Sequence, residues 1–208
     1  MKLYEFPPPV RSARAGRLQE LGVPFESVVV NMRAGEHRSP EFLEINPAGK
    51  LPVLVDGDLV LTESVAIVVY LAEKYPETGF LPTDPKPRAE VFRWLLFAAT
   101  ELEQPLWRIA RHTSIYPKEK RLPAEVLLAR EDFAKMARVL EEHMADRAFV
   151  ATDRVTVADF VTAYTLDWAN EVTLLEGLPR LQDYVKRMYA RASAAPRIAQ
   201  AIASLRAQ

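Results

Sequence analysis

Hydrophobic positions in the first part of the chain fall into short runs that alternate with a longer, helical period. Lys2–Phe6 is rich in aromatic residues and Phe25–Val30 is β-branched, so both are predicted strands, the second buried on both faces. Between them, Arg11–Leu21 places apolar residues on one helical face, and Gly22 follows where a helix commonly ends. This order predicts two parallel strands joined by a right-handed crossover.

The next segment indicates a helix, a hairpin and a second helix. Ser39 followed by Pro40 is a helix start, because serine is a preferred N-cap and proline fits the first turn. Asp56-Gly57-Asp58 predicts a tight hairpin turn, and Thr62 is a candidate cap for the helix after it. The predicted elements are a helix over 40–46, strands over 51–55 and 59–61, and a helix over 63–75.

After residue 87 the periodicity is helical throughout. The chain between 76 and 87 carries four prolines and is the best candidate for a linker. Pro105 predicts a kink or a break in a helix over 88–116, and Val157–Glu171 is so apolar that we expect it to form the core of this half. Further helices are predicted over 123–144, 178–192 and 196–205. The apolar side of the first of these consists of Val126, Leu127, Phe133, Met136, Val139 and Leu140.

These patterns predict an α/β part followed by an all-α part. We place the first domain over residues 1–78, a linker over 79–87 and the helical domain over 88–208. Thr156 and Asp159 have the spacing of a capping box, with Val155 and Phe160 at staple spacing, and are interpreted as structural. Replacing Asp159 with alanine should cost about 1 kcal/mol.

The amino-acid composition excludes several kinds of site. The 208 residues contain no cysteine, which excludes disulfides, thiolate metal sites and a cysteine nucleophile. A formal net charge of −1 offers no general attraction to nucleic acid or to anionic membranes. The three histidines are too widely spaced for a metal-ligand pattern, so we predict no metal. No run is long enough for a transmembrane helix or a signal peptide, which favours a cytoplasmic protein.

The string from Asn46 to Leu54 is the most informative in the chain. Pro52 opens a predicted strand, where it can be tolerated only at the first residue because it has no N–H to donate. A cis bond before Pro52 would turn the N–H and C=O of Leu51 outward, where an extended peptide could pair with them. A trans bond would merely begin a strand, and the string alone leaves both open.

Glu63 and Ser64 begin a predicted helix directly after a strand. Unpaired N–H groups and the helix dipole favour an anion there, and the Ser64 hydroxyl adds a donor. Glu63 can accept from an ammonium group, so the pair suits a zwitterionic amino-acid head group. The alternative is an ordinary helix start with an acidic first turn.

Taken together, this arrangement resembles the glutathione S-transferase family over essentially the whole chain. The resemblance implies a thioredoxin-like N-terminal domain, an all-helical C-terminal domain, and glutathione as co-substrate. It implies a cis Pro52, backbone pairing of Leu51 with the cysteinyl part of glutathione, and a γ-glutamyl group held by Glu63 and Ser64. It also implies a homodimer in which the helix after Glu63 faces the partner.

Basic residues in the first domain match family positions near the glycyl carboxylate. They are Lys50 and the pair His37-Arg38, which lies in a string that looks like the phi and theta-related classes. For His37 and Arg38 the alternative is a solvated loop before a helix.

The group that ionises the thiol is where the sequence departs from the family pattern. Phe6 stands where a tyrosine is expected, although Tyr4 is near, and Val10 stands at the usual serine. Ser12 could supply the hydroxyl if the prolines shift the register, and Arg11 could stabilise the thiolate by its charge. Both also have ordinary interpretations, as a helix cap and a surface arginine.

The resemblance places a hydrophobic electrophile between the two halves. The candidate pocket residues are Val10, Trp107, Arg111 and Tyr116, with Arg108 and His112 on the same helix. The first hypothesis is conjugation of reduced glutathione to such an electrophile by thiolate attack. The alternatives are a non-catalytic glutathione- or ligand-binding protein of the same fold, and a glutathione-dependent isomerase or disulfide reductase.

Overall fold

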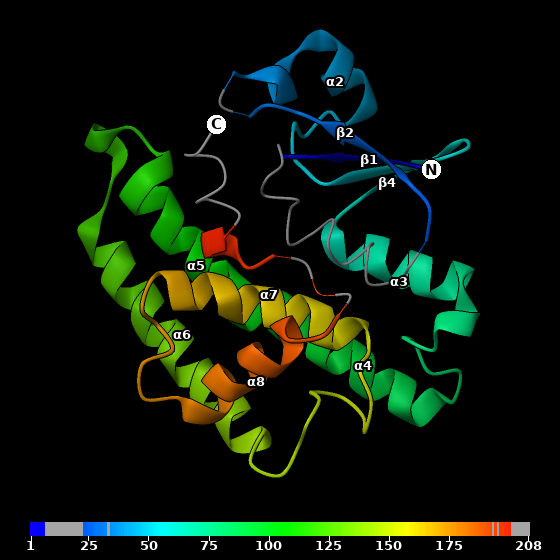
Figure 1. The fold of residues 1–208 in the computed structure, drawn as a ribbon. Coiled ribbons are helices and arrows are strands. Elements are labelled where there is room, and N and C mark those ends of the chain that lie inside the picture. Colours follow the sequence, from blue (N-terminus) through cyan, green and yellow to red (C-terminus); the bar gives the residue numbers. More distant parts are fainter. Residues whose placement is uncertain (7–22, 33, 193, 195, 201–208) are drawn as a thin grey trace. The chain divides into compact units, whose positions relative to one another are not determined.

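The structure is a computed structural model that describes residues 1–6, 23–32, 34–192, 194 and 196–200 (Figure 1). The helix predicted over 11–21 and the second half of the helix predicted over 196–205 lie outside these residues. The chain divides into two compact units, Met1–Leu81 with Tyr189–Gln208, and Pro82–Met188. The first is an α/β unit and the second is all-helical, which confirms the predicted fold class.

The first unit is built on a four-stranded mixed sheet in the order β2-β1-β3-β4. β1 (Lys2–Glu5) pairs in parallel with β2 (Glu26–Val29), as the sequence predicts for a crossover. β3 (Val53–Asp56) is antiparallel to β1 and to β4 (Leu59–Thr62). The hairpin between β3 and β4 turns at Gly57 and Asp58, where Gly57 has a φ of 64°.

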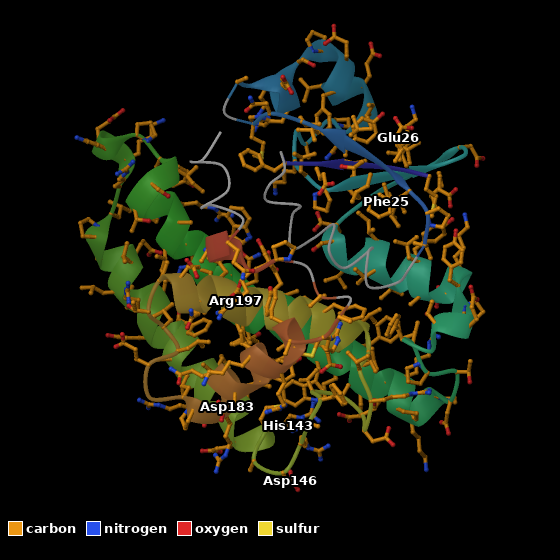
Figure 2. The ribbon with its side chains drawn as sticks, in the orientation of Figure 1. Phe25, Glu26, His143, Asp146, Asp183 and Arg197 are labelled. Carbon is orange, nitrogen blue, oxygen red and sulfur yellow. The ribbon has the colours of Figure 1, made fainter. Side chains whose placement is uncertain are left out.

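β2 is an edge strand, and the expectation that residues 25–30 are buried on both faces is wrong. The strand has one neighbour, and Glu26, Ser27 and Val29 are exposed, Val29 at 43% (Phe25 and Glu26 are labelled in Figure 2). β-branched residues favour any extended segment, so the apolar run identified a strand without giving its position in the sheet.

Two helices cover opposite faces of the sheet (Figure 1). α3 (Ser64–Lys74) packs Ile67 and Leu71 against Leu3 and Leu54. α2 (Pro40–Ile45) packs Phe42 against Val30 and Val53 on the other face. The unit also contains two 3₁₀ turns, η1 (Glu36–Arg38) and η2 (Pro76–Thr78).

The helical unit begins with an interrupted helix. α4 (Pro85–Phe97) passes into a π-helical turn η3 (Ala98–Leu102), then α5 (Glu103–Ala110), and a second π-helical turn η4 (Arg111–Ile115) ends the run. Pro105 lies in the first turn of α5, directly after η3, so the predicted break is confirmed. Proline cannot donate the next backbone hydrogen bond, which allows the helix to change its winding there.

α7 (Val157–Glu171) packs against α4, η3 and α5, and most of its side chains are buried, as predicted. α6 (Pro123–His143) follows the 3₁₀ turn η5 (Lys118–Lys120), and α8 (Pro179–Tyr189) follows α7. The predicted apolar side of α6 is partly wrong, because Leu127 and Val139 are 63% and 46% exposed. The inward positions include Ala129 and Ala137, whose small side chains give a weak hydrophobic signal.

Candidate functional site

The hairpin register brings two predicted site segments to one edge of the sheet. Val53 lies opposite Thr62, so the residues just before β3 are beside the residues just after β4. Leu51 and Pro52 are therefore next to Glu63 and Ser64, although they are separated along the chain. The Leu51–Pro52 peptide bond is cis.

A buried asparagine organises the loop that leads to Pro52. Asn46 is only 4% exposed, and its Nδ2 donates to the Lys50 carbonyl oxygen at 2.8 Å. Its Oδ1 accepts from the Ala48 N–H at 3.1 Å. The sequence indicated only that a helix ends here. A polar residue at the end of a helix, before Pro47, was the signal that could have identified Asn46 as the organiser of the loop.

Gly49 brings the same loop against the predicted basic residues. A Cβ on Gly49, which has a φ of 59°, would lie 2.9 Å from the His37 carbonyl oxygen and 3.0 Å from Arg38 Nη1. Only glycine fits both this conformation and this contact. His37 is half-buried, and its Nδ1 has no hydrogen-bond partner among the residues that the structure describes, whereas Arg38 and Lys50 are exposed. His37 and Arg38 thus border the loop that carries Lys50.

The start of α3 has an unusual backbone. Glu63 occupies the N-cap with a φ of 66° and a ψ of 116°, and its side chain makes no capping hydrogen bond. The prediction that Thr62 is the cap is wrong, because β4 extends through Thr62 and the helix begins one residue later than the cap would require. A non-glycine residue at positive φ is uncommon and is typical of functional sites.

The far end of α3 is tied to the hairpin. Asp56 Oδ2 accepts from Tyr70 Oη at 2.7 Å and also from Lys74 Nζ. These hydrogen bonds, that of Lys74 first, lower the pKa of Asp56 below its usual range. The contacts fix α3 against β3, and so fix the backbone of Ser64 relative to Pro52.

The predicted thiol-activating residues Arg11 and Ser12, and the pocket residue Val10, lie outside the described residues. Of the nearby residues that are described, Tyr4 packs its ring against Phe42, 6.1 Å between centroids. That contact places Tyr4 on the α2 side of the sheet, with the core around Val30 and Val53.

The helical candidates separate onto two sides of one helix. Arg108 and His112 face α6: Arg108 Nε donates to Glu125 at 3.1 Å, and His112 Nδ1 accepts from the Leu122 N–H at 3.1 Å. The Tyr116 ring meets His112, 5.2 Å between centroids. Trp107 instead contacts Trp168 of α7, so the contacts among the described residues do not bring all five candidates together.

Trp107 is held by its neighbours on the inner side of α5. Its Nε1 donates to Glu103 at 3.1 Å, and its ring stands edge-on to Trp168 of α7 with centroids 5.0 Å apart. Arg111 follows one turn later and is half-buried. An aromatic surface and a cation therefore adjoin on this side of the helix.

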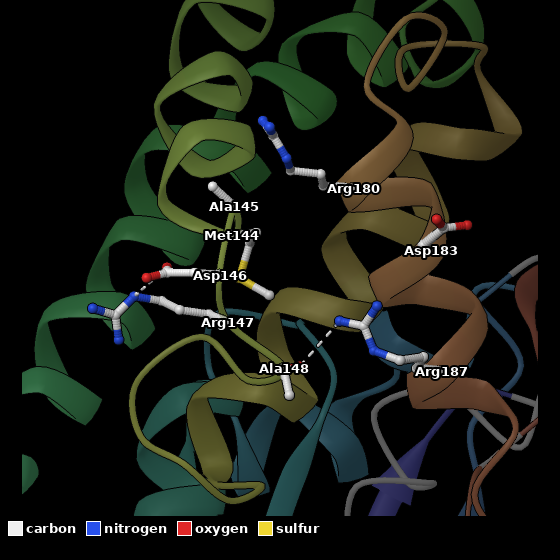
Figure 3. A pocket seen from close by; sticks show the side chains of 8 residues that line it. All are labelled: Met144, Ala145, Asp146, Arg147, Ala148, Arg180, Asp183 and Arg187. Atoms are coloured by element: carbon white, nitrogen blue, oxygen red, sulfur yellow. Dashed lines mark hydrogen bonds and ion pairs between the residues drawn. The ribbon is translucent and has the colours of Figure 1, made fainter.

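A cavity of about 330 Å³ lies elsewhere in the helical unit, between the end of α6 and α8 (Figure 3). Arg147 Nε lies 4.0 Å from Asp146 Oδ1, and Arg187 donates to the Ala148 carbonyl oxygen at 3.2 Å. None of the predicted site residues lines it. Residues lining it are Met144, Ala145, Asp146, Arg147, Ala148, Arg180, Asp183 and Arg187.

Neither a cluster of metal ligands nor a membrane-spanning helix is found in the part of the chain that the structure describes. There, no group of three or more His, Asp or Glu side chains is arranged to hold a metal ion. Within the same residues, no helix is both long and apolar enough to cross a membrane.

The fold and this site define a class of protein: a thioredoxin-like domain, with a cis proline at the start of its third strand, followed by a helical domain. The family model described as "Glutathione S-transferase, N-terminal domain" matches residues 1–73, and "Glutathione S-transferase, C-terminal domain" matches residues 103–192. The chain belongs to the glutathione S-transferase family.

Individual relatives support the same family. Glutathione S-transferase F10 of Arabidopsis thaliana is 40% identical over 147 residues, 68% of each chain. Human glutathione S-transferase theta-2 is 37% identical over 180 residues, 81% of this chain and 72% of that protein. The glutathione transferase URE2P6 from Phanerochaete chrysosporium, solved in complex with oxidized glutathione, aligns with a TM-score of 0.82 at 26% identity, covering 99% of this chain and 96% of that one.

Proposed function

We propose that the protein is a glutathione transferase that conjugates reduced glutathione to electrophiles. The observation that carries this is the pairing of Val53 with Thr62, which sets Leu51 and Pro52 beside the uncapped start of α3. One edge of the sheet thus offers a peptide-like backbone and a helix N-terminus together. Glutathione needs both, because it is an extended peptide with an anionic and ammonium-bearing head group.

In this proposal each part of glutathione has its own partner. The γ-glutamyl carboxylate binds at the Ser64 N–H and hydroxyl, and its ammonium group binds the Glu63 carboxylate. The cysteinyl part pairs with the Leu51 backbone. Lys50, with His37 and Arg38 beside the same loop, attracts the glycyl carboxylate.

The thiol is ionised by a residue that follows β1. Tyr4 is directed to the α2 side of the sheet by its contact with Phe42 and is set aside. We propose Ser12 as the hydroxyl that donates to the sulfur and Arg11 as the charge that favours the thiolate. The thiolate then forms a bond to an electrophilic carbon, and the leaving group departs with its electron pair.

Calorimetric titration with reduced glutathione tests the binding site. We expect Glu63→Gln and Ser64→Ala each to weaken affinity several-fold, because each removes one partner of the head group. Glu77→Gln is a matched control, since Glu77 is an exposed carboxylate in η2 of the same unit. Unchanged affinity in both site variants would reject this assignment.

Thiolate absorbance separates the enzyme from a binding module. If the protein is a transferase, bound glutathione absorbs as thiolate near neutral pH, and Ser12→Ala or Arg11→Met reduces that absorbance. Turnover of a chlorodinitrobenzene should fall in parallel. Binding without thiolate absorbance and without turnover would instead indicate a non-catalytic glutathione-binding protein.

A further inference from the structure

Arg111 is a half-buried arginine without an acidic partner among the described residues. Its backbone is engaged, since its N–H donates to the Trp107 and Arg108 carbonyl oxygens and its carbonyl oxygen accepts from the Tyr116 N–H. No hydrogen bond or ion pair of its side chain is found in the described part of the chain. A guanidinium has five N–H donors and cannot lose its charge, so partial burial without an acceptor is unfavourable. The side chain is therefore ready to receive an anion.

Arg108, three residues earlier, differs from Arg111 because its guanidinium is paired with acidic side chains. Arg108 is 30% exposed and is clamped by Glu125 and Asp132 of α6, which raise the pKa of its guanidinium further. The residues one turn from Arg111 are Trp107, Arg108, Ser114 and Ile115, none of them acidic. The positive charge at Arg111 is thus not neutralised by its own helix.

The neighbouring aromatic surface is fixed in place. Trp107 lies one turn before Arg111, held by Glu103 through its Nε1 and by the edge of the Trp168 ring. Both contacts restrain the half-buried indole, so its orientation is set before a flat apolar body packs against it. A molecule packed on Trp107 would have its substituent within reach of the guanidinium.

We infer that the electrophile this enzyme prefers carries an acidic oxyanion group, such as a carboxylate, which Arg111 binds while Trp107 packs against its aromatic body. The inference rests on the proposed glutathione transferase function and specifies its second substrate. Arg111 acts as a specificity-determining residue. A planar guanidinium is suited to this role because it can bind a carboxylate through two parallel hydrogen bonds.

Two matched electrophiles test the inference: chlorodinitrobenzoate and chlorodinitrobenzamide, which differ in charge but little in shape. In both, the glutathione sulfur bonds to the ring carbon and chloride leaves. We expect the wild-type kcat/KM to favour the benzoate, and Arg111→Met to lower the benzoate-to-benzamide ratio at least tenfold. Arg111→Lys should restore part of the ratio, because it keeps the charge without the planar fork.

Arg138→Met is the control, because Arg138 is an exposed arginine of α6, and it should leave the ratio as in the wild type. A ratio within twofold of the wild type in Arg111→Met, or a wild-type preference for the benzamide, would overturn the inference.

Equilibrium binding separates this inference from the proposed function. If the wild type conjugates neither compound, the proposed function fails, and calorimetry with unreactive dinitrobenzoate and dinitrobenzamide then judges Arg111 alone. Tighter binding of the benzoate, lost in Arg111→Met, would still support the anion site. Equal binding of both would refute it.

Discussion

The starts of α3 and α7 face the same physical problem and solve it differently. Both helices leave N–H groups without intrahelical partners. At α7 the chain satisfies them itself through a capping box, in which Asp159 accepts from the Thr156 N–H at 2.8 Å. At α3 the N-cap Glu63 has a positive φ, and its side chain makes no capping hydrogen bond. The start of α7 thus serves folding, whereas the start of α3 is where we propose that glutathione binds.

The cap of α7 extends beyond the box. Asp159 is fully buried and also accepts from the Val150 N–H at 2.8 Å and from Tyr184 Oη at 3.0 Å. Burial raises the pKa of Asp159, and these hydrogen bonds oppose that rise. One carboxylate thereby joins α7, α8 and the loop after α6. Among the described residues, no buried carboxylate holds the start of α3 in this way, and its backbone geometry comes from the sheet register and from Asp56 at the far end of the helix.

Removing the Asp159 carboxylate should give the largest effect. Asp159→Ala leaves the buried N–H groups of Val150 and Thr156 and the Thr156 hydroxyl without this acceptor, and Tyr184 keeps only the residue 159 carbonyl oxygen at 3.3 Å. We therefore expect a loss of about 3 kcal/mol in the free energy of unfolding. This exceeds the 1 kcal/mol expected of an isolated cap. Urea unfolding measures it, with Asp153→Ala, an exposed acid in the preceding loop, as the control.

Glutathione affinity of the folded Asp159→Ala protein should stay at the wild-type value. If the affinity fell together with the stability, the two helix starts would not be independent, and the comparison would fail.

The capping box shows what the sequence could predict. Thr156 and Asp159 are close in the sequence, so their spacing alone predicted the cap. Their partners Val150 and Tyr184 come close only in the folded chain, so the sequence could not predict them. Asn46 was missed for the same reason, because its role depends on a loop fold. The edge position of β2 depends on strand order, which no local pattern encodes. By contrast, Pro52 and Glu63 lie close together because of the β3–β4 hairpin, and the turn residues Asp56-Gly57-Asp58 did predict that hairpin.

A pH profile tests the support behind the α7 cap. His143, the last residue of α6 (Figure 2), has its Nε2 2.8 Å from the Val150 carbonyl oxygen and its ring stacked on Trp94. Burial lowers the pKa of His143 in the folded protein. Between that lowered pKa and the ordinary value of about 6.5, the unfolded chain binds more protons, so stability falls as the pH falls.

The contribution of His143 can be at most about 1.4 kcal/mol per pH unit. His143→Gln should remove it, which flattens the profile below pH ~6.5 relative to the wild type. The raised pKa of Asp159 acts with the opposite sign, so the difference between the two profiles is the quantity to measure. Parallel profiles would show that His143 does not titrate with unfolding.

The smallest expected effect concerns the backbone of Glu63. A positive φ costs a non-glycine residue about 1 kcal/mol, and glycine avoids this cost. Glycine also raises the conformational entropy of the unfolded chain, which cancels part of the gain in stability. Glu63→Gly should therefore be about 0.5 kcal/mol more stable than Glu63→Ala, although both lack the carboxylate and both bind glutathione weakly.

Thr173 provides the matched control, because it has a φ of 61° in the turn after α7, and none of the predicted site residues belongs to that turn. Thr173→Gly should be more stable than Thr173→Ala by a similar amount, with glutathione affinity unchanged in both. If glycine is more stable than alanine at both positions, but only substitutions of Glu63 weaken glutathione binding, the unfavourable backbone at the start of α3 is linked to ligand binding. A Glu63→Gly variant less stable than Glu63→Ala would show that the conformation of Glu63 carries no strain, and the contrast between the two helix starts would then reduce to their side chains.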